Sequence, residues 1–108
     1  DDVLIFIDQE GGKVARLKPP LFRECPSAGY FAKIAEDDLE LAAEKIYQNA
    51  NEIGEELRDI GINVNCAPVA DLLMENSSPI IGDRSFGSDP YKVMILAYAM
   101  AEGLIDAG

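Results

Sequence analysis

Two short apolar segments, separated by a long helical pattern, constrain the fold most. Residues 3–7 form a continuous apolar run rich in β-branched side chains, and Gly11 and Gly12 stop it. Residues 62–67 form a second segment, which Pro68 ends. Short apolar runs bounded by turn residues are typical of strands that are buried on both faces of a parallel sheet. We therefore predict two buried strands.

Helical periodicity fills most of the interval between these strands. From about Leu39 to Ile60, apolar residues recur near the i, i+3, i+4, i+7 spacing of an amphipathic helix. Asp37 or Asp38 is the expected N-cap, and Gly61 the expected left-handed residue after the helix. Gly54 costs helix stability, which predicts close packing at that position.

The rest of the chain predicts a loop and then a second helix. Residues 69–89 are rich in Asn, Ser, Gly, Pro and Asp, and a loop of that length in a compact domain tends to be functional. A helix is expected from Pro90 onward, with Asp89 as its N-cap. The order strand, helix, strand, helix predicts an α/β fold with parallel strands and right-handed crossovers. Two strands cannot form such a sheet alone, so we expect further strands in a parent protein.

Length and composition narrow the possibilities further. The 108 residues allow one domain at most, and the net charge of −11 argues against binding to nucleic acid or to an anionic membrane.

Cys66 lies in the second apolar segment and is expected to be a core residue, and its spacing from Cys25 does not suit a metal. A disulfide is left open, although a reduced cytosolic setting fits better. The chain begins at Asp1 without methionine and ends at Gly108 directly after a helical pattern, so we expect an internal fragment.

Polar residues follow each predicted strand, where parallel α/β proteins bind their ligands. Asp8 comes directly after the first strand, and its carboxylate can accept hydrogen bonds from neighbouring sugar hydroxyls. Arg16 and Arg84 carry planar heads with several donors. The alternative is that Asp8 or Glu10 pairs with one of these arginines as a structural ion pair.

Two other interpretations of the acids are weaker. Asp8 and Glu10 alternate along a strand-like segment and are expected to point to opposite sides, which does not suit a pair of glycosidase carboxylates. A metal site formed by Asp8, Glu10, Asp71 and Asp83 would suit a hard cation, but no dense acidic spacing supports it. We therefore predict no metal in this chain.

Three motifs resemble family 3 glycoside hydrolases. Residues 7–17 (IDQEGGKVARL) resemble the sugar-binding motif at the second barrel strand of that family. Residues 61–71 (GINVNCAPVAD) resemble its third strand, and residues 79–90 (PIIGDRSFGSDP) resemble the following loop. The resemblance implies that residues 1–108 are a fragment of an N-terminal barrel domain. The fold would be part of a (β/α)₈ TIM-type barrel, with about two consecutive βα units.

The resemblance also implies a substrate. The Gly-Asp-Arg-Ser-Phe form is similar to the β-N-acetylhexosaminidase branch, whereas the β-glucosidase branch usually has a tryptophan, which this chain lacks. In the family, the residues matching Asp8, Arg16 and Arg84 contact the terminal N-acetylglucosamine. Ser78 departs from the asparagine that often precedes the proline of the loop.

The catalytic groups of the family lie outside these motifs. Its Lys-His-Phe-Pro-Gly-His-Gly motif, its histidine acid/base and its aspartate nucleophile are expected beyond Gly108, and the chain contains no histidine. The parent is expected to be a retaining enzyme of muropeptide recycling in a bacterial cytoplasm, without metal or organic cofactor. The alternatives are a β-glucosidase of the same family, a non-catalytic sugar-binding relative, or an inactive truncated product.

Overall fold

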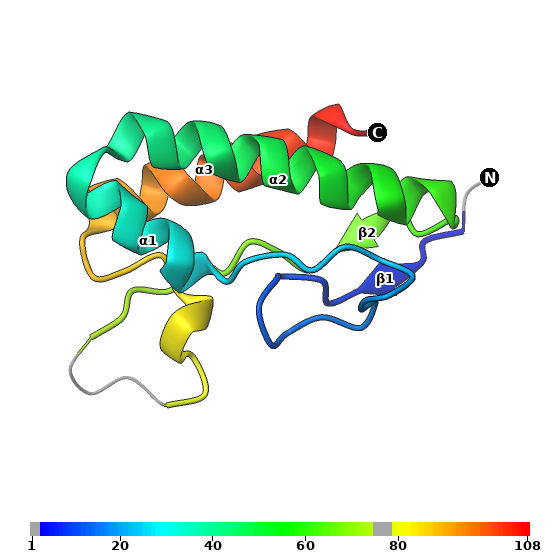
Figure 1. Ribbon diagram of the computed structural model, residues 1–108, viewed down its shortest axis with the longest axis horizontal. Coiled ribbons are helices and arrows are strands. Elements are labelled where there is room, and N and C mark those ends of the chain that lie inside the picture. The colour runs from blue at the N-terminus through cyan, green and yellow to red at the C-terminus, as the bar shows by residue number, and fades with distance from the viewer. Residues whose placement is uncertain (1–2, 75–78) are drawn as a thin grey trace.

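Helices and two short strands make up the computed structural model, which describes residues 3–74 and 79–108 (Figure 1). Helices α2 and α3 lie alongside each other, and the two strands lie beneath one end of α2. None of the helices in the described ranges is long and apolar enough to cross a membrane. Ser78, where the sequence departs from the family pattern, lies outside the described residues. The elements in chain order are β1 (Phe6–Ile7), α1 (Ala28–Asp37), α2 (Leu39–Asp59), β2 (Val64–Asn65), the 3₁₀ helix η1 (Gly82–Arg84) and α3 (Pro90–Asp106).

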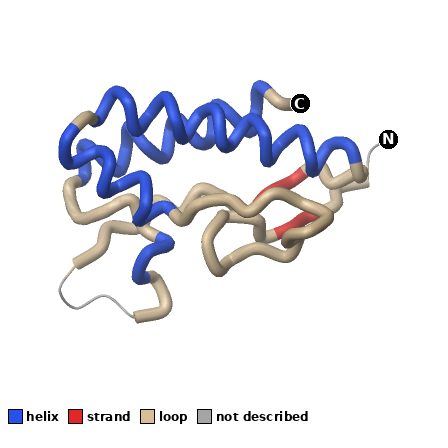
Figure 2. The backbone as a smooth tube through the Cα atoms, viewed as in Figure 1, coloured by secondary structure: helices blue, strands red, loops and turns tan. Residues whose placement is uncertain are grey.

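The two strands are parallel, which confirms the prediction from the order of elements. Phe6 is paired with Val64 and Ile7 with Asn65. Both strands are shorter than the predicted segments (Figure 2). The side chain of Asn63 continues the pairing, since its Oδ1 accepts from the Ile5 N–H at 2.7 Å and its Nδ2 donates to the Val3 carbonyl at 2.9 Å. A side-chain amide thus supplies the hydrogen bonds that a longer backbone ladder would make.

The prediction of buried strands is wrong for this chain. Val3 is 68% exposed and Phe6 is 60% exposed. Cys66 is exposed as well, so the prediction that it is a core residue is also wrong. The physical reason is that the described part of the chain has only these two strands, so one face of the pair and both of its edges lack covering residues. Both cysteines are free thiols.

The sequence predicted one helix between the two strands, but the structure has two, because α1 precedes α2. Ser27 caps α1, and its Oγ accepts from the Tyr30 N–H at 3.3 Å. Asp38 alone separates the two helices: its N–H donates to Ile34 at the end of α1, and its Oδ1 accepts from the Leu41 N–H at the start of α2. The order is therefore strand, helix, helix, strand, helix.

Close packing of α2 against α3 forms the main core. Buried residues of the two helices face each other, with α1 and Phe86 completing the cluster. Gly54 confirms the predicted close approach, because a Cβ atom there would lie 2.5 Å from Ala107 Cβ. Gly61 has the expected positive φ of 90°, and Asp89 caps α3 as predicted. Cys25 belongs to a second cluster, and burial raises the pKa of its thiol to about 11, so it stays protonated at neutral pH.

Gly103 tests how tight this helix contact is. A Cβ atom there would lie 2.5 Å from the Tyr47 carbonyl oxygen and 2.8 Å from Ala50 Cβ. Alanine normally stabilises a helix relative to glycine by roughly 0.5–1 kcal/mol, but overpacking costs about 1–3 kcal/mol. We expect Gly103→Ala to lower the stability of the complete protein in urea unfolding, while Glu102→Ala, on the exposed side of α3, leaves it within about 0.5 kcal/mol.

The bare face of the strands generates a second prediction. We expect the 108-residue chain, expressed alone, not to form a rigid monomer, because it leaves apolar side chains of residues 3–6 and two strand edges in water. Calorimetry and backbone NMR of the purified chain measure this directly. A sharp cooperative melt with dispersed amide signals from a monomer would contradict the prediction.

Candidate functional site: the loop after β1 and the loop before α3

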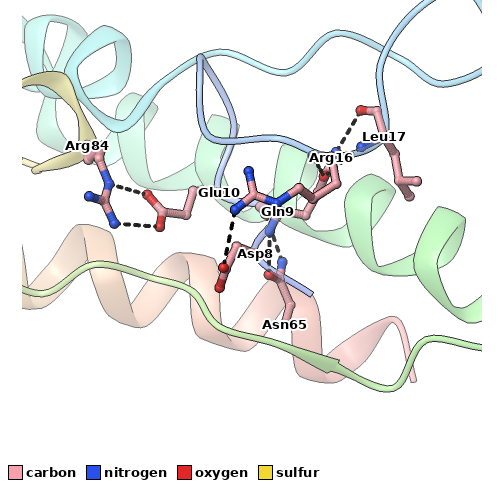
Figure 3. Close-up of polar contacts among 7 residues, drawn as sticks. All are labelled: Asp8, Gln9, Glu10, Arg16, Leu17, Asn65 and Arg84. Carbon is pink, nitrogen blue, oxygen red and sulfur yellow. Dashed lines mark hydrogen bonds and ion pairs between the residues drawn. The ribbon is translucent and has the colours of Figure 1, made fainter. Parts of the chain in front are cut away.

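Three consecutive side chains after β1 make different contacts. Asp8 meets Arg16, Gln9 is buried under the following loop, and Glu10 meets Arg84 (Figure 3). The backbone leaves extended pairing after Ile7, so these residues are free to diverge. One short segment therefore organises both halves of the candidate site.

Gln9 holds the loop that carries Arg16. Its side chain is buried, and its Oε1 accepts from the Arg16 N–H at 2.8 Å and from the Leu17 N–H at 3.2 Å. Its Nε2 donates to the Leu17 carbonyl at 3.0 Å. A buried amide with its polar groups satisfied fixes the local backbone, because leaving any of these groups unpaired would be costly.

Asn65 in β2 holds Gln9 in turn. The Gln9 N–H donates to Asn65 Oδ1 at 3.0 Å, and Asn65 Nδ2 donates to the Gln9 carbonyl at 2.8 Å. The amide therefore pairs with both backbone groups of one residue, just beyond the last strand pair. This contact connects the end of β1 to β2 at the point where the polar loop that begins with Asp8 leaves the strand.

Glu10 and Arg84 form a bidentate ion pair between segments 74 residues apart. Arg84 Nε donates to Glu10 Oε1 and Arg84 Nη2 donates to Glu10 Oε2, both at 3.0 Å. The side chains are 11% exposed for Glu10 and 25% exposed for Arg84. The hydrogen bonds that Arg84 donates to Glu10 raise the pKa of Arg84 above its usual value, and the negative charge of Glu10 adds to this effect. Arg84 therefore stays charged wherever the protein is folded.

The backbone around Arg84 is fixed by Ser85. This residue is buried, and its Oγ donates to the Asp71 carbonyl at 2.7 Å and accepts from the Gly87 N–H at 3.1 Å. The Leu73 N–H donates to the Gly87 carbonyl at 2.8 Å. The loop predicted from its composition therefore contains an ordered turn, with η1 presenting Arg84.

Asp8 and Arg16 make a much weaker contact. Arg16 Nη2 lies 3.5 Å from Asp8 Oδ2, and the side chains are 61% and 50% exposed respectively. An exposed pair at that distance contributes about 0–1 kcal/mol at most. The ion-pair alternative is thus observed for both arginines, but only the pair with Glu10 has the geometry of a strong one.

An open hollow of about 460 Å³ brings the three predicted site residues together. The prediction that Asp8 and Glu10 point to opposite sides is not met, because both border this hollow. Alternation applies only within a strand, and β1 ends at Ile7. The residues that line the hollow are Asp8, Glu10, Lys13, Val14, Arg16, Cys66, Val69 and Arg84.

The four acids considered for a metal do not gather. Among the residues that the structure describes, no cluster of three or more Cys, Asp or Glu could hold a metal ion. Glu10 is instead engaged by Arg84 through both carboxylate oxygens. The site is therefore one of charged hydrogen-bonding groups around a hollow, which suits a ligand rich in hydroxyl groups.

Comparison with known families agrees with this geometry. Residues 2–108 match the Glycosyl hydrolase family 3 N terminal domain. The chain belongs to glycoside hydrolase family 3. The match extends over both polar loops and all the helices, so the resemblance seen in the three motifs is confirmed.

The relatives of this family 3 chain include several β-hexosaminidases. It is 38% identical over 104 residues to the β-hexosaminidase LpqI of Mycobacterium tuberculosis, covering 96% of this chain and 25% of that protein. It is 40% identical over 106 residues to a β-hexosaminidase of Tolumonas auensis, covering 98% of this chain and 30% of that protein. The chain thus spans less than a third of these relatives.

Solved structures show the same arrangement of elements. NagZ from Neisseria gonorrhoeae superposes with a TM-score of 0.90 at 32% identity, covering 97% of this chain and 31% of that one. The same enzyme is also known in complex with N-trifluoroacetyl-D-glucosamine, again with a TM-score of 0.90. The family 3 chain therefore shares the fold of this part of NagZ.

Sequence reasoning did not identify the supporting residues Gln9 and Asn65, or Lys13 at the rim of the hollow. Gln9 is a polar residue between two acids, and nothing in its spacing shows that it turns inward. Asn63 and Asn65 alternate with Val64 and Cys66, and polar residues at every second position of a predicted buried strand were the signal that could have been used.

Gln9 generates a testable prediction. Gln9→Ala removes the partner of the Arg16 and Leu17 amides, so the complete protein should lose roughly 1–3 kcal/mol of stability. Hydrogen exchange at those two amides should accelerate more than in the core helices. Gln48→Ala, at an exposed position of α2, is the matched control and should change neither quantity. Unchanged exchange at both amides in Gln9→Ala would contradict the assigned role.

Proposed function

We propose that the protein containing this chain hydrolyses terminal β-N-acetylglucosaminides and that Asp8, Arg16 and Arg84 bind the terminal sugar. The observation that carries this proposal is the convergence of these three residues on one open hollow. They come from the loop after β1 and the loop before α3, on the side where parallel strands end. The names of the β-hexosaminidase relatives support the same activity.

Asp8 is the best-placed anchor for sugar hydroxyls. Its carboxylate is half exposed at the hollow, and among the described residues it forms a hydrogen-bonded ion pair only with the Arg16 guanidinium, at 3.5 Å. A ligand would therefore displace little structure when it binds. An ionised carboxylate has two oxygens that accept hydrogen bonds from neighbouring hydroxyl groups.

Arg84 and Arg16 complement that acceptor with donors. N-acetylglucosamine carries a carbonyl oxygen and several hydroxyl oxygens, which accept hydrogen bonds from guanidinium groups. The neighbouring structure of NagZ with N-trifluoroacetyl-D-glucosamine supports a ligand of this chemistry. The proposed substrate class is therefore a β-linked N-acetylglucosaminide, and a muropeptide is one such molecule.

The proposed reaction needs groups that this chain does not supply. Retaining glycosidases form a covalent glycosyl-enzyme intermediate at a nucleophile, with a separate acid/base. We propose that this chain forms about two consecutive βα units of a (β/α)₈ barrel and that the acid/base histidine and the nucleophilic aspartate lie in the remaining part. The role of the residues described here is to bind and orient the sugar. A place in peptidoglycan recycling in the cytoplasm is part of the same proposal.

Two other functions make different predictions. A β-glucosidase of the same family would not require the acetamido group, and a non-catalytic relative would bind the sugar without hydrolysing it. The Gly-Asp-Arg-Ser-Phe segment at residues 82–86 favours the hexosaminidase. Comparing the hydrolysis of 4-nitrophenyl N-acetyl-β-glucosaminide with that of 4-nitrophenyl β-glucoside by the complete protein distinguishes the three.

Asp8→Asn tests the sugar-binding role. The amide keeps the shape but removes the charge and halves the acceptor capacity, so N-acetylglucosamine should bind about tenfold to a few hundredfold more weakly to the complete protein. The melting temperature should stay close to that of the unaltered protein, because the contact with Arg16 is weak. Calorimetric titration and thermal unfolding measure both quantities.

The control is Asp37→Asn, which removes an equal charge at the end of α1. It should leave binding unchanged. Intact affinity in Asp8→Asn would end the assignment of Asp8 to the sugar, and a lowered melting temperature with intact affinity would make it a structural partner of Arg16.

A further inference from the structure

We propose that Glu10 is a positioning residue for Arg84. Glu10 holds the guanidinium so that its unpaired N–H donors face the hollow, and the negative charge of Glu10 cancels the positive charge of Arg84. This inference rests on the proposed function, because it concerns how Arg84 meets the sugar. Glu10 itself need not touch the ligand. Its role follows from three features of the pair.

The first feature is the edge of the guanidinium that Glu10 occupies. An arginine has five N–H donors, one on Nε and two on each terminal nitrogen. Glu10 takes one donor from Nε and one from Nη2. Among the described residues, neither N–H group of Nη1 nor the second N–H of Nη2 donates to a protein acceptor. The bidentate contact fixes the plane of the head, so the direction of those donors is fixed as well.

The second feature is that the pair borders two different environments. One is a small cavity of about 20 Å³, lined mainly by apolar groups that include Phe31, Phe86 and Met100. The other is the open hollow with Asp8 and Arg16. Glu10 and Arg84 border both. Donors that are not satisfied by Glu10 are therefore best satisfied from the hollow, because apolar groups cannot accept hydrogen bonds.

The third feature is the charge of the pair. Glu10 and Arg84 together carry no net charge, although the guanidinium keeps its directional donors. A neutral pair suits the hydroxyl and acetamido oxygens of an uncharged sugar. An unpaired Arg84 would instead attract anions, since a free guanidinium binds phosphate and carboxylate groups well. The carboxylate thus sets the specificity of the arginine as well as its direction.

Glu10→Gln in the complete protein separates positioning from simple support of the fold. The amide keeps the shape but restores a net positive charge at Arg84. We expect N-acetylglucosamine to inhibit hydrolysis about tenfold more weakly, on the scale of one disturbed charged hydrogen bond, and inorganic phosphate to inhibit several-fold more strongly. If the role of Glu10 were purely structural, Glu10→Gln would lower the melting temperature without shifting inhibition from N-acetylglucosamine towards phosphate.

A double variant tests whether Glu10 acts through Arg84. Arg84→Ala should weaken N-acetylglucosamine inhibition by roughly 30- to 150-fold, and Arg84→Lys should recover little, because an ammonium cannot reproduce the fork. Adding Glu10→Gln to Arg84→Ala should cause little further loss in inhibition, since the positioned group is already absent. Full additivity of the two effects would overturn the inference.

Two further variants keep the test decisive. Glu10→Asp keeps the charge on a shorter side chain, so phosphate should inhibit it no more strongly than it inhibits the unaltered protein. This variant keeps the test valid even if Glu10→Gln folds poorly. Asp83→Asn is the matched control, because it removes the adjacent carboxylate of η1, which is exposed and is not the carboxylate that pairs with Arg84. It should leave both inhibition constants unchanged.

The outcomes for this inference and for the proposed function differ. If the unaltered protein is inhibited by N-acetylglucosamine and Arg84→Ala weakens this inhibition as expected, but both Glu10 variants behave like the unaltered protein, the inference alone is overturned. If the unaltered protein neither hydrolyses the glucosaminide nor binds N-acetylglucosamine, the proposed function fails, and the inference fails with it.

Discussion

The candidate site depends on the bidentate contact between Glu10 and Arg84. It joins the loop after β1 to the loop before α3, and no contact within either loop could fix their separation. Both partners are at most a quarter exposed, so the pair is screened less than the surface ion pair of Asp8 and Arg16. Removing one partner would leave the other charge unpaired next to apolar groups.

Amide side chains extend this constraint to the rest of the site. Asn65 binds both backbone groups of Gln9, and Gln9 binds the backbone of the loop that carries Arg16. The chain of contacts runs from β2 through the end of β1 to the rim of the hollow. These supporting residues are buried or half-buried, whereas Asp8 and Arg16 are exposed. Such a division leaves the side chains proposed to bind the sugar free while their backbone is held.

Local signals in the sequence predicted the parallel strand pair, α2 and α3, because each depends on periodicity or on a cap such as Asp89. The first strand was predicted to be buried, but burial depends on covering neighbours, and in the described part of the chain this strand pairs only with β2. Helix α1 was missed because it is short and follows a proline-rich loop, although Ser27 is a suitable cap. The predicted site residues Asp8, Arg16 and Arg84 line one hollow in the structure. That Arg84 pairs with Glu10 rather than with Asp8 could be seen only in three dimensions.

A crystal structure of the complete protein with bound N-acetylglucosamine would show whether Arg84 meets the sugar while Glu10 holds it. We expect the sugar in the hollow, with its hydroxyl groups donating to Asp8 and one of its oxygens accepting from Nη1 of Arg84. Arg84 should still donate to Glu10 through Nε and Nη2, close to the present 3.0 Å. A sugar bound elsewhere, or an Arg84 that leaves Glu10 to reach the sugar, would contradict this expectation.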